Sequence, residues 1–222
     1  MIVGIHQPNY LPYLGFFDKM KKSDIFVIYD DAQFNKGDFQ HRNRIKIHNG
    51  SKWLTVPVEK QHKPINEIRV INDSMIKNEK WSIHHLNQIY DNYNKAQCFE
   101  DYFDGLSLIY GEDYQYLFEL NMKLISFMND SFDIDTKIVN SSSYPSTSFS
   151  TKRLIELVQA VGGDAYLSGP SGVNYLDVEM FEKSGIDLLF QKFDHPLYRQ
   201  QYDGFIPNMS AIDSLLNGYR FD

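Results

Sequence analysis

The 222-residue sequence has a single cysteine, Cys98, and no long uninterrupted apolar run. One cysteine excludes an internal disulfide bond and any zinc site built from several cysteines. A helix that crosses a membrane needs about 18 consecutive apolar residues, so we expect no membrane insertion. The N-terminus shows neither the basic start nor the apolar core of a signal peptide. Together these absences favour a cytoplasmic protein.

The sequence also has fewer basic than acidic residues, with 22 Lys and Arg against 29 Asp and Glu, and its formal net charge is -7. Proteins that hold nucleic acid depend on basic surfaces, so nucleic acid is not expected as the main ligand, although a local basic patch remains compatible with these numbers. The HExxH, GxSxG, GxGxxG and GxxxxGK[ST] motifs are absent. The sequence therefore points to no metal site, and it identifies no cofactor.

Aromatic residues are abundant, with 16 Phe, 15 Tyr and 2 Trp. Hydrophobic residues make up 42% of the chain and charged residues 23%, which is ordinary for a folded protein with a sizeable core. Buried tyrosine hydroxyls need hydrogen-bond partners, which suits a wet cleft, while a genome-wide bias toward Phe, Tyr, Asn and Lys would give the same composition. We expect residues 1–222 to form a single domain.

The order of the apolar runs predicts an α/β fold. Ile2–Ile5 and Ile25–Tyr29 are nearly continuous apolar runs, and a helical pattern from Leu11 to Met20 separates them. Lys19 then suits a helix C-terminus. Such a βαβ unit is typical of a parallel sheet that is covered on both faces. Helices and strands alternate again near the end of the chain, at Lys152–Val161, Ala165–Leu167, Leu176–Lys183 and Ile186–Phe190.

Four further segments complete the predicted architecture, a mostly parallel central sheet with a β-hairpin and a helical lobe. Asn49–Gly50 lies between β-rich runs and is a strong hairpin signal. Ile68–Ile71 has the composition of a short strand. A helical period extends over about residues 75–132 and predicts a lobe of three helices, broken at Gly111–Asp113. Asn140–Ser148 has the composition of a loop.

The first candidate site is the polar turn that follows the first predicted strand. It contains His6, Gln7, Asn9 and Tyr10. Ligands of open α/β sheets bind beyond the carboxyl ends of the strands, and His6 is suited there to donate to a phosphate or to move a proton. A turn held by Asn and Pro, with a hydrogen-bonded histidine, would give the same sequence.

Two carboxylates, Asp30 and Asp31, follow the second predicted strand, and Gln33 comes shortly after. Adjacent side chains of an extended chain point opposite ways, so at most one carboxylate should face a cleft shared with His6. A metal ligand, a general base, a holder of sugar hydroxyls or a simple cap are the interpretations of these carboxylates, and the base is either His6 or Asp30. His6 and Asp30 are the predicted catalytic residues.

The third candidate is a basic and amide-rich segment. Arginine side chains offer planar, multiple donors that suit a phosphate or carboxylate, and neighbouring amides favour a small, oriented ligand. A nucleic-acid patch or a solvated loop would look similar. Its predicted substrate-binding residues are Lys36, Gln40, Arg42, Asn43 and Arg44.

Two later segments complete the candidates. Ser168, Gly169 and Ser171 follow a predicted strand, where a phosphate or sugar could approach the backbone, although a plain turn fits equally well. His195 and Gln201 lie in a polar and aromatic stretch that also suits a docking loop. We expect the polar segments to converge in one cleft at the carboxyl edge of the sheet.

The sequence resembles the WbqC-like protein family over nearly its whole length. The segments that carry the resemblance are Ile5–Phe17, Asp30–Phe34, Phe39–Ile45, Trp53–Val58, Tyr166–Gly169, His195–Gln201 and Ser210–Asp213. This family is known from bacterial gene clusters for O-antigen and other surface polysaccharides. The resemblance implies a cytoplasmic role in making or modifying activated sugars. In that context we expect an enzyme that transfers an acyl or aminoacyl group to the amine of a nucleotide-linked amino sugar, with a nucleotide sugar and an activated acyl donor as partners.

A second resemblance is to nucleotidyltransferase-like α/β enzymes such as pantothenate synthetase. These enzymes place a short His–x–Gly–His turn on a triphosphate. His6 matches the first histidine, but the second is absent, since Tyr10 to Gly15 occupy that region. A nucleotidyl transfer and a non-catalytic module that binds nucleotide sugars or a partner therefore remain as alternatives.

Overall fold

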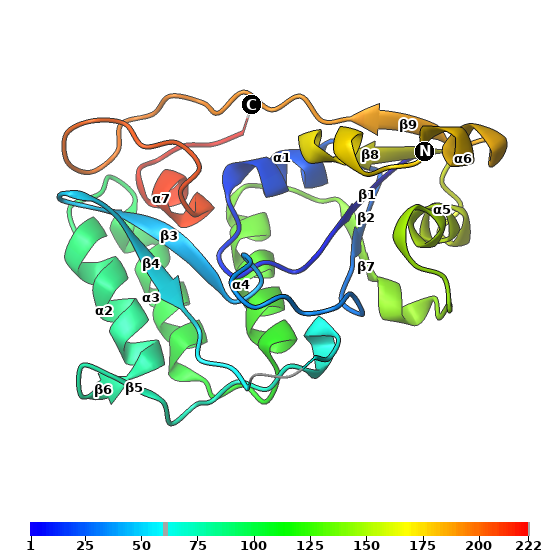
Figure 1. Cartoon of the computed structure of the whole chain (residues 1–222). Helices are drawn as coiled ribbons and strands as arrows, with labels where there is room; N and C mark the ends of the chain where they lie inside the picture. Colours follow the sequence, from blue (N-terminus) through cyan, green and yellow to red (C-terminus); the bar gives the residue numbers. More distant parts are fainter. Residues whose placement is uncertain (60–61, 222) are drawn as a thin grey trace. The chain divides into compact units, whose positions relative to one another are not determined.

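The computed structural model describes residues 1–59 and 62–221, and its centre is a five-stranded sheet in the order β7-β2-β1-β8-β9 (Figure 1). All neighbouring strands are parallel. The prediction of an α/β fold with a mostly parallel central sheet is confirmed, and every pairing in this sheet is parallel. The strands are β1 (Ile2–His6), β2 (Ile25–Ile28), β7 (Lys137–Asn140), β8 (Ala165–Ser168) and β9 (Asp187–Phe190).

The chain divides into two compact units. The first consists of Met1–Gln7, Gly15–Asp31 and Ile134–Asp194, and the second of Pro8–Leu14, Ala32–Asp133 and His195–Asp222. The single-domain expectation for residues 1–222 stays a prediction. Besides the sheet, the first unit contains most of helix α1 (Leu14–Lys21), the 3-10 helices η2 (Ser141–Ser143) and η3 (Pro170–Asn174), and helices α5 (Ser150–Ala160) and α6 (Val178–Lys183).

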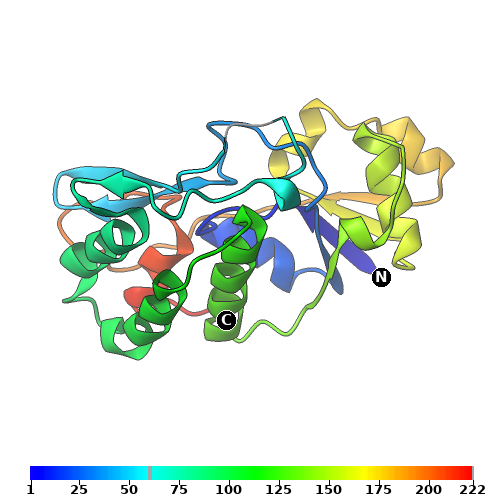
Figure 2. The same cartoon turned by 90° about the horizontal axis from the view of Figure 1, so that it is seen from below.

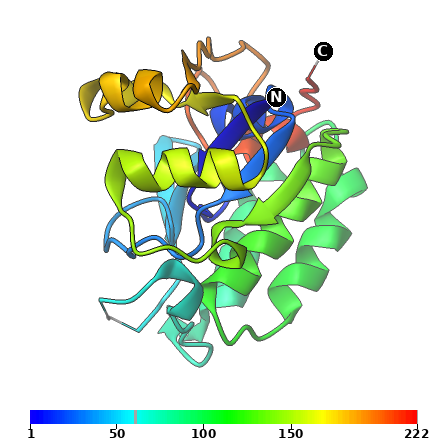
Figure 3. The same cartoon turned by 90° about the vertical axis from the view of Figure 1, so that its right-hand side faces the viewer.

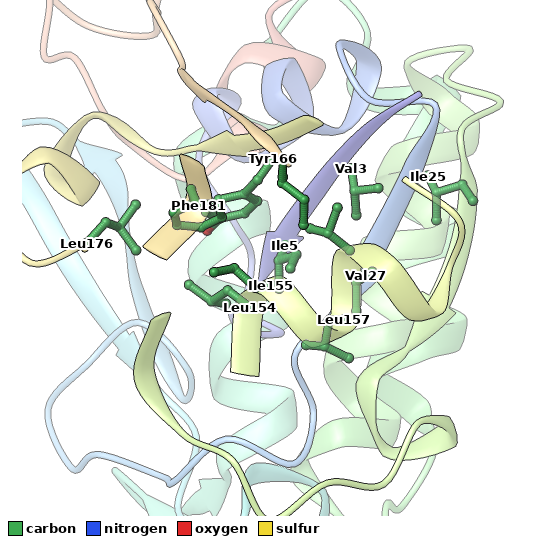
Figure 4. Packing of buried hydrophobic residues seen from close by; sticks show 12 residues of the cluster. Val3, Ile5, Ile25, Val27, Leu154, Ile155, Leu157, Tyr166, Leu176 and Phe181 are labelled. Atoms are coloured by element: carbon green, nitrogen blue, oxygen red, sulfur yellow. The ribbon is translucent and has the colours of Figure 1, made fainter. Parts of the chain in front are cut away.

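Helices cover both faces of the sheet, as its continuous apolar strands require. Leu157 and neighbouring residues of α5 pack on Val3 and Val27 of β1 and β2 (Figure 4). Figure 3 looks onto α5, which lies across the strands. Successive side chains of a strand alternate in direction, so Phe26 points away from this cluster. Its ring lies 5.2 Å from the ring of Phe16 in α1, which therefore covers the other face.

The end of α5 depends on a glycine pair. Gly162 has a φ of 80°, a left-handed conformation that glycine adopts without strain and that terminates helices. The Gly163 N–H donates to the Val158 carbonyl at 2.8 Å. A Cβ on Gly163 would lie 2.4 Å from the side chain of Val3. The missing side chain thus lets the chain leave the helix directly against β1.

The second unit holds the predicted hairpin and the predicted helical lobe. The lobe's three helices lie side by side, α2 against α3 and α3 against α4 (Figure 2). The start of the predicted lobe, residues 75–80, instead forms a small strand pair around Lys77 and Asn78, whose φ angles of 50° and 67° make a tight turn. The elements are β3 (Arg42–Ile47), β4 (Gly50–Thr55), η1 (Ile65–Glu67), β5 (Met75–Ile76), β6 (Glu79–Lys80), α2 (Trp81–Tyr93), α3 (Phe99–Gly111), α4 (Leu117–Ser131) and α7 (Ala211–Leu216).

Three local features differ from the expectations. The strand expected at Ile68–Ile71 is reduced to isolated bridges, Val70 with Val58 and Arg69 with Tyr116, because its neighbours are single residues of other segments. Helix α1 begins only at Leu14, since Leu11 has a left-handed φ of 45°. Strand β7 was not predicted from the sequence. It has only two apolar residues between polar neighbours, so its composition gives little signal.

Candidate functional site

A cavity of about 350 Å³ opens in the first unit at the carboxyl ends of the central strands. Along the chain, β2 and β7 are added on one side of β1, and β8 and β9 on the other. The sheet therefore reverses its building direction between β1 and β8, which is where open α/β sheets bind ligands. The lining residues are Ile5, His6, Gln7, Lys19, Tyr29, Ser150, Thr151, Leu154, Tyr166, Gly169, Ser171 and Tyr175.

His6 is the last residue of β1 and has a defined tautomer. Its Nδ1 lies 2.9 Å from the carbonyl oxygen of Gln7, which can only accept, so Nδ1 carries the proton. The ring packs edge-on against Phe16 at 5.0 Å. Burial, and secondly the charge of Lys19, lower the pKa of His6 to about 4. At neutral pH the imidazole is therefore uncharged, with a lone pair on Nε2.

Lys19 is the residue that the sequence analysis missed, because it was interpreted as a helix C-terminal charge. It is 2% exposed, and its Nζ donates to the carbonyl of Ile5 at 2.6 Å. Its Nζ also lies 5.7 Å from the ring centre of Tyr166. Burial lowers the pKa of Lys19 to about 7. The sequence signal for its burial is its position three residues after the buried Phe16, on the core-facing side of α1.

Two backbone features shape the rim of the cavity. Ser150, at the start of α5, has a left-handed φ of 55°, a conformation that costs about 1 kcal/mol for a residue with a side chain. Strain of this kind is often held at functional sites. The predicted Gly169 and Ser171 line the cavity, whereas Ser168 is fully buried and donates to the Gly169 carbonyl at 3.1 Å. Ser168 therefore supports the turn from beneath.

Asp30 and Asp31 do not point opposite ways, contrary to the expectation. Both carboxylates contact the hydroxyl of Ser141, because the two residues lie in a turn after β2 and not in an extended strand. Both oxygens of Asp30 also accept hydrogen bonds from Ser142, at 2.9 Å from its N–H and 2.6 Å from its hydroxyl. Asp31 pairs with the buried Arg153 at 3.0 Å. These contacts tie β2 to η2 and α5, and neither carboxylate lines the cavity.

The candidate amides of the second unit bind backbone. Gln40 accepts from the N–H of Asn35 at 2.8 Å, and Gln33 donates to the carbonyl of Lys63 at 3.2 Å. The amide of Asn43 donates to the carbonyl of Leu11 at 2.6 Å. In the structure these side chains therefore hold loops together, and the expectation that they orient a ligand has no support from these contacts.

Tyr10 is a core residue and Asn9 is also buried. The Tyr10 hydroxyl lies 2.8 Å from Nδ1 of His85 and also contacts the hydroxyl of Tyr110. Burial is the main reason that the pKa of Tyr10 is raised and that the pKa of His85 is lowered to about 3. We expected buried tyrosine hydroxyls to need hydrogen-bond partners. Here the hydroxyls of Tyr10 and Tyr110 contact each other, and Tyr10 also contacts the neutral His85.

Arg42 and Arg44 extend from the same face of β3 over one indole ring. Their guanidinium carbons lie 4.4 and 5.5 Å from the centre of Trp53. The Nε atoms of both arginines are buried without a hydrogen-bond partner among the described residues. Lys36 lines a separate cavity of about 430 Å³, together with His41, His62, Thr55 and four apolar residues. The two arginines keep planar donors that a phosphate would accept.

The last two candidates, His195 and Gln201, also belong to the second unit. Nδ1 of His195 lies 2.9 Å from the carbonyl of Pro196, and Gln201 donates to the side chain of Asn217 at 2.8 Å. His6 belongs to the first unit and Arg42 to the second. Their convergence in one cleft therefore stays a prediction.

A family model described as the WbqC-like protein family matches residues 7–220. The chain belongs to the WbqC-like protein family. "Uncharacterized protein Rv1507c" of Mycobacterium tuberculosis is 35% identical over 217 residues, which are 97% of this chain and 93% of that relative. No solved structure matches the chain significantly.

The WbqC-like match spans nearly all of both units and includes Lys19, while His6 directly precedes its first residue. Across residues 1–59 and 62–221, no three His, Cys, Asp or Glu side chains gather in a way that would hold a metal ion. In the same part of this WbqC-like chain, no helix has the length and apolarity needed to cross a membrane.

Proposed function

We propose that this WbqC-like protein is an enzyme of bacterial surface polysaccharide biosynthesis that transfers an acyl or aminoacyl group to the amine of a nucleotide-linked amino sugar. The observation that supports it is that the half-buried His6 and the buried Lys19 line the same cavity. His6 offers a neutral imidazole with a lone pair on Nε2, and Lys19 has a pKa of about 7. Strongly shifted pKa values in a cleft are typical of catalytic acids and bases.

In this reaction the amine nitrogen attacks the acyl carbon, so that a C–N bond forms while the bond to the leaving group breaks. The proton of the nitrogen passes to Nε2 of His6. The ammonium group of Lys19 stabilises the negative charge that develops on the acyl oxygen. Because the imidazolium of His6 is a strong acid in this environment, it returns its proton to the leaving group.

For the second unit taken by itself, we assign phosphate binding to Arg42 and Arg44. Their guanidinium groups are held by the Trp53 ring, and their Nε atoms have no partner among the described residues. A rigid, planar set of donors matches the geometry of a phosphate better than a flexible ammonium group does.

A non-catalytic binding module for nucleotide sugars is the second candidate. It is favoured by one observation, the engagement of Asp30 and Asp31 with Ser141, Ser142 and Arg153, which leaves the cavity without a carboxylate base. A nucleotidyltransferase would use ATP in place of an acyl donor.

A thermal-shift panel of the full chain separates these functions. It contains nucleotide-linked amino sugars, acyl thioesters and ATP, each alone and in pairs. The proposed transferase should be stabilised by a nucleotide sugar and by an acyl donor, and a mixture should release the free thiol. Stabilisation by the sugar alone supports the binding module, and stabilisation by ATP with release of pyrophosphate supports the nucleotidyltransferase. The absence of stabilisation by any nucleotide sugar would exclude the proposed substrate class.

A further inference from the structure

A second, larger cavity of about 770 Å³ lies within the second unit. It is formed by the loop that follows His195, by the turn between α2 and α3, and by the residue after α7. A volume of several hundred Å³ is typical of small-molecule sites. The lining residues are Lys95, Gln97, Tyr198, Arg199, Gln200, Gln201, Tyr202, Asp203, Gly204, Phe205 and Asn217.

The charges of this cavity favour an anion. Lys95 and Arg199 are exposed, and neither has an ion pair or a hydrogen bond in the described part of the chain. Asp203 is the single acidic residue of the lining, so the formal charge there is +1, from two cations and one anion. This is opposite in sign to the net charge of -7 of the whole chain. Arginine and lysine side chains bind phosphate through strong, charge-assisted hydrogen bonds.

The uncharged part of the lining favours a sugar. Gln97, Gln201 and Asn217 provide amides, which can donate to hydroxyl groups and accept from them. Gln201 is held by its hydrogen bond to Asn217 at 2.8 Å. Tyr198 and Tyr202 add aromatic rings, which have apolar faces and a polar edge. Hydroxyl-bearing rings with an attached phosphate match this combination.

Two buried charges hold the loop of this cavity in place. The carboxylate of Asp213 is fully buried and accepts from Tyr198 and Gln200, each at 2.7 Å. Lys46, which is 1% exposed, donates to the carbonyls of Tyr202 and Gly204. Burying a charge is costly unless it is well paired, and a loop that only connects two elements does not require it. The arrangement is what a preorganised binding loop needs.

The spacing of Ser210 and Asp213 has the form of a capping box at the start of α7, but the Asp213 side chain does not complete it. Ser210 caps α7 by accepting from the N–H of Ile212 at 3.3 Å. The Asp213 side chain turns to the tyrosines instead, with the Tyr93 hydroxyl at 2.8 Å. The carboxylate therefore serves the loop of the cavity and not the helix end.

We propose that this cavity is a second ligand site, which binds a phosphorylated sugar. Lys95 and Arg199 hold the phosphate, and Gln97, Gln201 and Asn217 hold the sugar hydroxyls. The site uses no residue of the cavity around His6. The proposal of this second site is therefore independent of the proposed transferase activity.

Calorimetric titration of the full chain tests this site with four probes: glucose 1-phosphate, UDP-glucose, inorganic phosphate and glucose. We expect a phosphorylated sugar to bind more tightly than phosphate or glucose. The double variant Lys95→Gln/Arg199→Gln should weaken that binding by at least about tenfold, because two charge-assisted contacts are lost. Lys123→Gln, which removes an exposed lysine outside the lining, should leave the affinity for the phosphorylated sugar unchanged.

Glucose 1-phosphate and UDP-glucose distinguish a sugar monophosphate from a nucleotide sugar as the source of the phosphate. Gln201→Leu should lower the affinity for the sugar probe that binds and leave the affinity for inorganic phosphate unchanged. Binding of every phosphate probe with equal affinity, or full affinity in the double variant, would overturn the proposal. Absence of binding by all four probes at millimolar concentration would overturn it as well.

Discussion

The imidazole of His6 is placed so that its chemical role can be separated from its structural role. Its Nδ1 proton is bound to the Gln7 carbonyl, and only Nε2 is proposed to take a proton. His6→Asn keeps a donor for that carbonyl but cannot titrate near neutral pH. We expect turnover to fall by roughly 100-fold or more, while the melting temperature and the affinity for the nucleotide sugar change little. Steady-state kinetics with the donor and acceptor found in the thermal-shift panel measures this, and unchanged turnover would remove His6 from catalysis.

Lys19 should make the stability of the protein depend on pH. Its pKa is about 7 in the folded state and about 10.5 when unfolded, so between these values the unfolded chain binds more protons and stability rises with pH. The free energy of unfolding of the wild type, relative to Lys19→Met, should rise by about 1.4 kcal/mol per pH unit between about pH 7.5 and 10. Urea unfolding at several pH values measures the difference. A difference that stays constant over this range would contradict burial of the ammonium group.

Arg42 tests whether the planar guanidinium group matters for binding. Arg42→Lys keeps the charge but loses both the fork of donors and the flat contact with Trp53 at 4.4 Å. We expect the affinity for the nucleotide sugar to fall by about tenfold, since a charge-assisted pair of hydrogen bonds becomes a single contact. Arg69→Lys is the matched control, because Arg69 also lies over an aromatic ring, at 5.7 Å from Tyr116. An equal loss in both variants would point to a general effect of charge geometry and against a phosphate site.

Among the elements, the end of α5 packs closely against β1. A Cβ at Gly163 would lie 2.4 Å from Val3 and 3.0 Å from Val158, both in the core of the sheet. Gly163→Ala should therefore destabilise the fold by about 1–3 kcal/mol through overpacking. Gly111→Ala, at the end of α3, meets nothing within 4 Å and should be neutral or slightly stabilising. Equilibrium unfolding in urea compares the two, and equal stability would contradict the close contact.

Elements with strong periodicity were predictable from the sequence, and those defined by tertiary contacts were not. The apolar runs gave β1, β2, β8 and β9, and the helical period gave α2, α3 and α4. Strand β7 lacks such a run and exists because β2 offers a parallel edge. The segment Ile68–Ile71 has strand composition but lacks a strand to pair with.

The residues of the candidate site also divide into those that the sequence predicts and those whose position depends on tertiary contacts. His6, Gly169 and Ser171 were predictable because they lie at or shortly after the end of a strand, and strand ends meet at one edge of the sheet. Lys19 was not, since a lysine near the end of a helix usually faces water. The paired direction of Asp30 and Asp31 was not predictable either, because it follows from a turn that Ser141 stabilises from a distant part of the sequence.

At the scale of the whole molecule, neither unit is a continuous stretch of chain. The polypeptide passes between the units after Gln7, Leu14, Asp31, Asp133 and Asp194. Buried residues of the second unit therefore come from both ends of the chain, for example Tyr10 and Leu215. The helical lobe at about residues 75–132 cannot complete this core alone, although its helices were predictable in isolation.

The position of β1 affects how the chain folds while it is being synthesised on the ribosome. One edge of this strand pairs with β2, from Val3 with Ile25 onward, as soon as the first βαβ unit has emerged. The other edge pairs with β8, where Ile2 lies opposite Ala165. During synthesis of the whole intervening segment, the central strand of the mature sheet presents unpaired N–H and C=O groups. A nascent chain in that state is a template for pairing with other chains, so the longest exposure to aggregation falls on the strand that bears His6.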